Sequence, residues 1–258
     1  TSRNTLYKLI YGSRAAVEEI ILQSNKNETP NLTNQNDENS VTPSTTFLGV
    51  KIHSGDILLS RGGAPTSALI SRGSDYPGNF SHVALVYVDP KTNVASIIEA
   101  HIEVGVAIAT LEDYMRDKKL RVLVLRLRSD LPVLLADPML PHKVATASLN
   151  RALKEHIPYD FEMDYKNSNK LFCSEVASSE YSRLGINLWM GKSTVSSKGT
   201  AKLLAGFGVK YFETQEPSDL EYDPQLSVVA EWRDSETLYK DHVDNAVVDA
   251  ILEWSEEG

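Results

Sequence analysis

Residues 82–104 of this 258-residue chain, HVALVYVDPKTNVASIIEAHIEV, decide its fold class. Two apolar runs rich in β-branched residues flank the polar stretch DPKTN, a pattern that predicts two strands joined by a turn. The second run alternates between apolar and ionisable residues, so one face of this hairpin carries Glu99, His101 and Glu103. Three ionisable groups on one strand face, beside an apolar face, indicate a candidate functional site.

Further elements extend outward from this hairpin. Apolar runs at 56–59 and 120–127 predict two more strands, and helical spacing over 141–153 and 173–184 predicts two helices later in the chain. Strands grouped before helices are typical of an α+β fold rather than of alternating β-α-β units.

Composition divides the chain into four segments. Residues 1–24 have the spacing of an N-terminal helix, and residues 25–48, rich in Asn, Thr, Ser and Asp, predict a flexible polar linker. The main domain is expected over 49–210, followed by an acidic C-terminal flank, 211–258, that ends in a helix. This flank holds 14 Asp/Glu against 2 Lys/Arg, so its net charge of −12 exceeds the −9 of the whole chain.

Composition also excludes several classes of protein. With 41% hydrophobic and 24% charged residues, the chain is an ordinary globular protein. Its acidic balance argues against nucleic-acid binding, because phosphate recognition needs a basic surface. No run approaches the ~18 apolar residues of a transmembrane helix. Residues 1–24 lack the layout of a signal peptide. The compartment stays open, with the cell envelope or secretion slightly favoured over the cytoplasm.

Cys173 is the chain's single cysteine, so it forms no internal disulfide and no cysteine-rich zinc site. It opens the predicted helix 173–184, where free backbone N–H groups favour a thiolate. A nucleophilic thiolate needs a base, and His82, at the start of an apolar strand, is a candidate. Paired residue numbers in the hairpin sum to about 181–183, so His82 faces Glu99 in one register and His101 in the other.

Each of these residues also has a plain structural interpretation. A lone cysteine beside Phe172 is commonly an inert core residue, and Glu99 and Glu103 can belong to the solvent side of an edge hairpin. A metal site made of His82, His101 and either glutamate has suitable ligands but lacks a local ligand spacing. We therefore expect no metal and no cofactor.

Five sequence blocks occur in an order that resembles a known family. They are 54–59 (SGDILL), 80–86 (FSHVALV), 97–100 (IIEA), 158–160 (PYD) and 172–176 (FCSEV). They resemble the circularly permuted branch of the NlpC/P60 papain-like cysteine hydrolases, in particular the YiiX/YebB-like group. Papain-like enzymes ordinarily run from cysteine to histidine, whereas here, as in the permuted branch, the histidine block precedes the cysteine block.

This resemblance implies a circularly permuted papain-like fold, in which an antiparallel sheet packs against the helix that carries the cysteine. It implies a triad of Cys173 as nucleophile, His82 as base and Glu99 as the residue that orients His82. His101 or Glu103 could replace Glu99 in that role. Tyr159 matches a tyrosine that helps to hold the substrate or an oxyanion.

The family's commonest activity implies a thiol hydrolase that cleaves amide bonds, chiefly in cell-wall peptides, through a thioester acyl-enzyme. Permuted relatives that act on or bind lipids leave two alternatives open: a lipid-directed acyl hydrolase or acyltransferase, and a catalytically silent ligand-binding module. The expected partner is a peptide or acyl-lipid substrate, with a peripheral membrane or cell-wall contact also open. Trp189 and Met190, with the apolar stretch 201–207, could line a lipid groove or fill the core, and the core is favoured.

Overall fold

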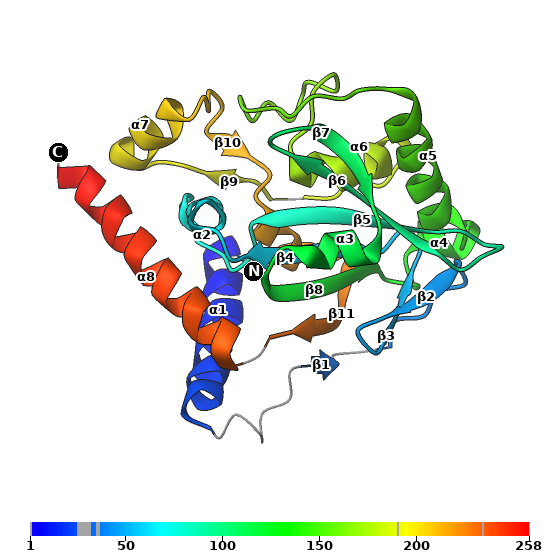
Figure 1. Ribbon diagram of the computed structural model, residues 1–258, viewed down its shortest axis with the longest axis horizontal. Helices are drawn as coiled ribbons and strands as arrows, with labels where there is room; N and C mark the ends of the chain where they lie inside the picture. The colour runs from blue at the N-terminus through cyan, green and yellow to red at the C-terminus, as the bar shows by residue number, and fades with distance from the viewer. Residues whose placement is uncertain (1, 25–31, 35–36, 190, 234, 258) are drawn as a thin grey trace.

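The computed structural model describes residues 2–24, 32–34, 37–189, 191–233 and 235–257 (Figure 1). Its centre is a seven-stranded antiparallel sheet with the strand order β1-β11-β8-β4-β5-β6-β7. These strands are β1 (Leu32–Asn34), β4 (Ile57–Gly62), β5 (His82–Val88), β6 (Ala95–His101), β7 (Gly105–Ala109), β8 (Lys119–Leu127) and β11 (Leu226–Trp232).

Alternation along the strands supplies two apolar faces. Val83 and Leu85 of β5 belong to the larger core, which includes residues of α5 (Leu140–Lys154) and α6 (Cys173–Arg183). Ala84 belongs to a second core on the other face. That face is covered by the hairpin of β2 (Ser44–Phe47) and β3 (Val50–His53) and by α3 (Leu111–Arg116). The predicted α+β class, with an antiparallel sheet against the helix that carries the cysteine, is confirmed.

The short motif before β4 joins the sheet to α5 and α6. Gly55 has a φ of +97°, and a Cβ there would lie 2.3 Å from Pro141, so this position favours glycine. Its carbonyl accepts a hydrogen bond of 2.5 Å from the Tyr181 hydroxyl of α6. Asp56 accepts two hydrogen bonds of 2.8 Å from the Arg126 guanidinium of β8. The close approach of Pro141 and the hydrogen bond from Tyr181 therefore hold α5 and α6 against the loop that precedes β4.

The predicted four-segment division differs from the structure at two places. Residues 25–48 were expected to form a flexible linker, yet within them β1 pairs with β11 and β2 pairs with β3. Residues 25–31 and 35–36 lie outside the described residues. Polar contacts hold the rest, since Arg126 donates to the Glu38 carbonyl and Thr42 donates to the Ser54 carbonyl. The linker was predicted from its small number of aliphatic residues, and that criterion does not detect hydrogen bonds of this kind.

The boundary expected at residue 210 also falls inside the fold. β11 lies between β1 and β8 in the central sheet, and Leu220 of the 3-10 helix η2 (Pro217–Tyr222) belongs to the larger core. The boundary was predicted from the acidic composition of 211–258, which does not reveal that individual apolar residues in this segment belong to the core. The flank does end in a helix, α8 (Ser235–Glu257).

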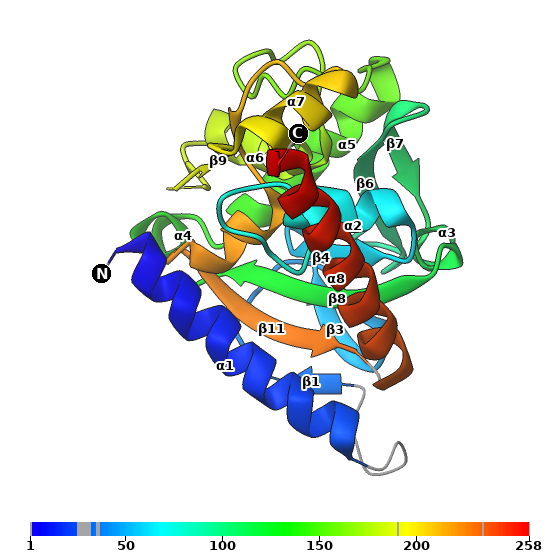
Figure 2. The ribbon, with the colours of Figure 1, turned by 90° about the vertical axis from the view of Figure 1, so that its left-hand side faces the viewer.

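Helix α8 and the N-terminal helix α1 (Arg3–Gln23) lie on the side of the molecule opposite α5 (Figures 1 and 2). α8 packs against α2 (Pro65–Arg72), α7 (Lys198–Gly206) and β8. The remaining elements are α4 (Pro132–Ala136) and the two-stranded pair of β9 (Ser193–Thr194) and β10 (Glu213–Thr214). Within the part of the chain that the structure describes, no helix is both long and apolar enough to cross a membrane.

Candidate active site

Cys173 is the first residue of α6, after Phe172 in an extended conformation. The preceding segment is held by hydrogen bonds of 3.1 Å from Leu171 N–H to the Pro158 carbonyl and 3.2 Å from Asp160 N–H to the Leu171 carbonyl. The Cys173 side chain is buried, and its Sγ lies 3.9 Å from the Ser81 carbonyl oxygen. The thiol therefore sits where the helix N-terminus, with its free N–H groups, meets the start of β5.

His82 and Glu99 come from neighbouring strands of the sequence-predicted hairpin. Ala84 pairs with Glu99, so paired numbers sum to 183, one of the two expected registers. Alternate residues share a face, which places His82, Glu99 and His101 on the same side. The His82 Nε2 to Glu99 Oε2 distance is 2.6 Å, and Glu99 thus reaches His82 diagonally across the two strands.

Glu99 contacts both imidazoles. Its second oxygen, Oε1, lies 3.1 Å from Nε2 of His101. The Glu99 side chain is 3% exposed, whereas those of His82 and His101 are 20% and 38% exposed. Glu103 lies after the end of β6 and is exposed. Of the three candidates for orienting His82, Glu99 is the one in hydrogen-bond contact with it. The His101 ring lies beside the His82 ring, with 5.8 Å between their centroids, and contacts the same carboxylate, whereas Glu103 is exposed.

The charges of these groups support one another. Burial disfavours the charged form of His82, but hydrogen bonds to Cys173 and Glu99 and their negative charges raise its pKa to about 9. Burial likewise opposes a Cys173 thiolate, and the hydrogen bond and charge of His82 outweigh it, so the Cys173 pKa is lowered. Burial is again outweighed at Glu99, where His101 and His82 lower the pKa to about 2. The contacts thus shift Cys173 toward the thiolate and His82 toward the imidazolium, with the Glu99 carboxylate beside His82.

Tyr159 is placed close to this group by the same segment that leads into α6. It forms an isolated bridge with Leu171, and its ring packs edge-on against Phe161 with a centroid distance of 5.2 Å. Burial, followed by the negative charge of Cys173, raises the pKa of Tyr159 above its ordinary value. Tyr159 is therefore a neutral hydroxyl at the edge of the site.

A cavity of about 90 Å³ opens beside Cys173 and is lined mainly by apolar side chains. Its walls come from α2, the loop after Tyr159, α7 and the segment before η2, and they include Leu69, Ile70, Tyr159, Met163, Leu204, Val209 and Glu216. Sequence reasoning missed most of these walls, because α2 is short and its few apolar residues gave no helical signal. The expectation that 201–207 fills the core is wrong in part: Leu204 lines the cavity and Phe207 is 61% exposed. Trp189 is a core residue, as favoured, and Met190 lies outside the described residues.

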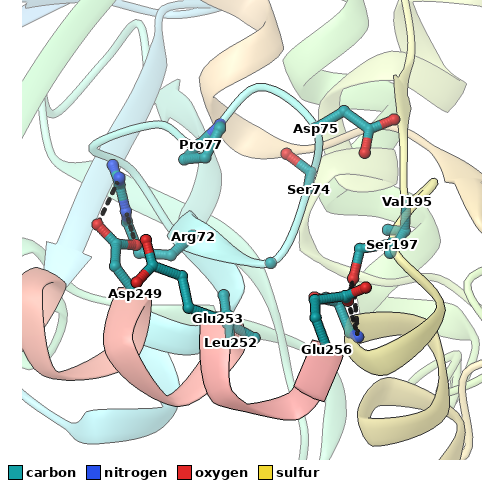
Figure 3. Close-up of a pocket in the computed structure, with 12 residues that line it drawn as sticks. Arg72, Ser74, Asp75, Pro77, Val195, Ser197, Asp249, Leu252, Glu253 and Glu256 are labelled. Atoms are coloured by element: carbon teal, nitrogen blue, oxygen red, sulfur yellow. Dashed lines mark hydrogen bonds and ion pairs between the residues drawn. The ribbon is translucent and has the colours of Figure 1, made fainter.

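A second cleft, of about 370 Å³, adjoins this cavity at Gly73 and Val195, which line both (Figure 3). Its charged lining consists of one arginine and four carboxylates: Arg72, Asp75, Asp249, Glu253 and Glu256. Figure 3 shows Asp249 paired with Arg72, at 2.8 Å, and Glu256 turned toward Ser197. We call it the outer cleft. The surroundings of the Cys173 cavity are thus acidic on this side.

Metal ligation was one alternative for the histidines. Among the described residues, no group of three or more His, Cys, Asp or Glu side chains is arranged to hold a metal ion. His82, His101 and Glu99 instead satisfy one another through the hydrogen-bonded contacts given above.

Comparison with known proteins gives one family and one solved structure. The model of the permuted papain-like amidase family described as YaeF/YiiX, C92, matches residues 51–230. The crystal structure of a protein titled metalloprotein YiiX, from Escherichia coli O157:H7, has a TM-score of 0.54 and 21% identity, covering 70% of this chain and 97% of that one. At this identity the likeness supports the fold alone. No curated protein matches the chain.

Proposed function

This chain belongs to the YaeF/YiiX family of permuted papain-like amidases, and from that premise we propose that Cys173, His82 and Glu99 are its catalytic triad. The family makes the protein a cysteine hydrolase of the amidase or peptidase type, as the resemblance of its sequence blocks implied. One observation carries the triad. The thiol at the start of α6 lies close enough to His82 for each group to shift the pKa of the other toward its charged form, and the His82 Nε2 lies 2.6 Å from the buried Glu99 carboxylate.

The chemistry follows from the charges of these groups. The Cys173 thiolate attacks the carbonyl carbon of the amide, and the developing oxyanion is stabilised by backbone N–H groups at the start of α6. Tyr159, a neutral hydroxyl donor, can add to that stabilisation. His82, already an imidazolium, gives its proton to the leaving amine, and the acyl group remains on Cys173 as a thioester.

Release of the acyl group reverses the role of His82. The neutral imidazole takes a proton from water as the water attacks the thioester, and Cys173 leaves as thiolate. Glu99 holds the imidazole in orientation and stabilises its cationic form during both steps. His101 holds the other oxygen of that carboxylate, with its Nε2 3.1 Å from Glu99 Oε1.

For the substrate we propose an amide that carries an apolar group next to the scissile bond. The support is the lining of the Cys173 cavity by Leu69, Ile70, Leu204 and Val209, since apolar walls favour apolar groups. The cavity of about 90 Å³ is well below the ~300 Å³ of a drug-sized site and suits a short chain or a side chain. Cell-wall peptides, which the sequence resemblance placed first, become the second candidate, because the cavity lining is mainly apolar.

The test is hydrolysis by the whole chain of matched amide substrates: N-acyl amino acids of increasing acyl length, and muropeptides. We expect turnover of the short N-acyl amides and, by mass spectrometry, one acyl group bound to each protein molecule during the reaction. Both should be lost in Cys173→Ala. Turnover of muropeptides alone would favour the second candidate.

A silent binding module is tested by the reactivity of Cys173. With a lowered pKa the thiol of the folded protein should react with iodoacetamide at neutral pH. Alkylation only after unfolding, together with no turnover of either substrate class, would overturn the proposed function. His82→Gln, which removes the base but not the thiol, should slow alkylation and serves as the matched control.

A further inference from the structure

Glu216 is the single carboxyl group among the described residues that line the Cys173 cavity. Its backbone is held from both sides: its N–H donates to Asp219 Oδ2 at 3.0 Å, and its carbonyl accepts from Trp189 Nε1 at 3.1 Å. No described side chain donates a hydrogen bond to its carboxyl oxygens, and the carboxyl does not cap η2. The catalytic steps proposed above make no use of it. Glu216, which is partly buried, thus adds one carboxyl group to a mainly apolar lining.

The surroundings of Glu216 disfavour its negative charge. Burial is the largest influence, followed by the negative charges of Asp219 on η2 and Cys173 on α6, and together they raise its pKa to about 8. Arg3 of α1 acts in the opposite sense, but it is paired with Asp219. Tyr159, which also lines the cavity, is a neutral hydroxyl, because its pKa is raised above its ordinary value. Glu216 is therefore a neutral carboxylic acid at neutral pH.

We propose that Glu216 is a specificity-determining residue, which donates a hydrogen bond from its neutral carboxyl group to an acceptor oxygen of the substrate inside this cavity. A carboxylic acid kept neutral by an apolar site is a hydrogen-bond donor, as an ionised carboxylate is not. The cavity then takes an apolar chain that bears a carbonyl or hydroxyl oxygen near the scissile amide. This assignment rests on the proposed function for its catalytic readout, while the charge of the cavity can be measured without turnover.

The charge of the cavity is measured with two thiol reagents of similar size whose opposite charges do not change with pH, 2-(trimethylammonio)ethyl and 2-sulfonatoethyl methanethiosulfonate. Cys173 is the single cysteine of the chain, so both reagents report on this cavity. Deprotonation of Cys173 accelerates both reactions equally and cancels in the ratio of their rates. Across pH 6–10 we expect the cation-to-anion ratio to rise about tenfold with a midpoint near 8, as Glu216 ionises.

Two variants separate Glu216 from its neighbours. Glu216→Gln is neutral at every pH and should abolish the rise near pH 8, leaving a smaller rise near 9 that belongs to loss of the His82 charge. Glu253→Gln removes one carboxylate from the outer cleft and should leave the midpoint unchanged. A flat ratio in the wild-type chain, or an equal rise in Glu216→Gln, would overturn the proposal.

The catalytic readout is kcat/KM against pH with an oxygen-bearing N-acyl amide. Glu216→Leu, which cannot donate, should lower kcat/KM about tenfold at pH 7, mainly through KM, as expected for one neutral hydrogen bond. Glu216→Gln should recover part of this loss and move the alkaline limb from near 8 to near 9. With an N-acyl amide that lacks the acceptor oxygen, Glu216→Leu and Glu216→Gln should have the same kcat/KM at pH 7. Equal losses on both substrates would contradict a role in specificity.

The two proposals fail differently. If Cys173 reacts with both thiosulfonates in the folded protein but without a pH-dependent charge preference, the assignment of Glu216 is wrong and the triad stands. If Cys173 is inert to both reagents until the chain unfolds, the proposed function is wrong. Thermal melting of each variant shows whether it is folded, and a flat wild-type ratio overturns the assignment even if Glu216→Gln does not fold.

Discussion

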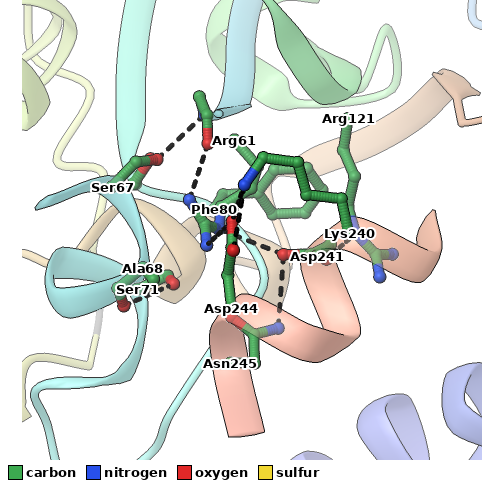
Figure 4. A network of polar contacts seen from close by, with 12 residues as sticks. Arg61, Ser67, Ala68, Ser71, Phe80, Arg121, Lys240, Asp241, Asp244 and Asn245 are labelled. Carbon is green, nitrogen blue, oxygen red and sulfur yellow. Dashed lines mark hydrogen bonds and ion pairs between the residues drawn. The ribbon is translucent and has the colours of Figure 1, made fainter. Parts of the chain in front are cut away.

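Two clusters of buried charge lie on different sides of this molecule, and they are built from different cations. Behind the sheet, Arg61 and Arg121 surround Asp241 of α8, with side chains that are 0% exposed (Figure 4). At the proposed active site, His82 and His101 contact the two oxygens of Glu99, and the imidazoles are 20% and 38% exposed. One cluster encloses its carboxylate with groups that are charged at any ordinary pH, and the other uses groups that can gain and lose a proton.

The cluster of arginines stabilises the fold, whereas the cluster of histidines is suited to proton transfer. Arg121 binds Asp241 through Nε at 2.6 Å and Glu18 of α1 through Nη1, so the first cluster ties two terminal helices to β8. We call it the helix clamp. The proposed catalytic cluster joins His82, His101 and Glu99 of two neighbouring strands to Cys173 of α6, and Cys173 borders an open cavity. Buried charges that are fully enclosed serve the fold, whereas those with one open side are available to a substrate.

The largest effect is expected from Asp241→Leu in the helix clamp. The change leaves two fully buried arginines without their shared carboxylate, so the free energy of unfolding should fall by about 3–5 kcal/mol. Urea denaturation measures it. The matched control is Asp244→Asn, because Asp244 lies 4.0 Å from Arg61, is partly exposed and should matter much less. Equal effects of the two substitutions would show that enclosure of Asp241 is not what stabilises the clamp.

The second prediction concerns the catalytic cluster and should affect rate more than stability. Glu99→Gln keeps the shape of the side chain but removes the charge that orients and stabilises cationic His82, so kcat should fall about 100-fold or more. The pKa of His82 should also fall below 9, which kcat/KM against pH and imidazole NMR both report. Glu103→Gln, an exposed glutamate on the same hairpin, is the control and should retain wild-type rates.

The residues of the proposed catalytic cluster could be predicted from the sequence because their positions depend on short-range patterns. A short turn and period-two alternation bring His82, Glu99 and His101 to one face, and a helix start gives Cys173 its position. The helix clamp follows no such rule, since Arg61 and Asp241 are ordinary charged residues far apart in sequence. The cavity walls were missed for the same reason: Leu204 and Glu216 come from segments whose packing is decided only by the tertiary fold.

The third prediction compares the clusters in acid. Each contains a carboxylate whose pKa is lowered to about 2 although burial opposes it: Glu18 is lowered by His242 and Arg121, and Glu99 by His101 and His82. A lowered folded-state pKa means that the stabilisation is complete above pH 4.5, the ordinary value, and is lost as the pH falls toward 2. Each carboxylate should account for about 2 kcal/mol of that loss.

Urea titrations at pH 2.5, 3.5, 4.5 and 6 test this prediction with Glu18→Gln and Glu99→Gln. Each variant should lose less stability than the wild-type chain on acidification, because one titrating group is gone. At pH 6 Glu18→Gln should be the less stable of the two, since it also weakens the contact of α1 with β8. A wild-type acid dependence in both variants would mean that neither carboxylate titrates near 2.

The smallest effect is expected from His101→Asn, which tests whether Glu99 can orient His82 without His101. His101 reaches the far oxygen of Glu99 at 3.1 Å and is the most exposed member, so its loss should cost about 0.5–1 kcal/mol of transition-state stabilisation, a few-fold in kcat/KM. The reason is that the Glu99 to His82 contact of 2.6 Å remains. A loss as large as that of Glu99→Gln would instead make His101 a positioning residue on which Glu99 depends, and the catalytic cluster would then resemble the helix clamp in needing every partner.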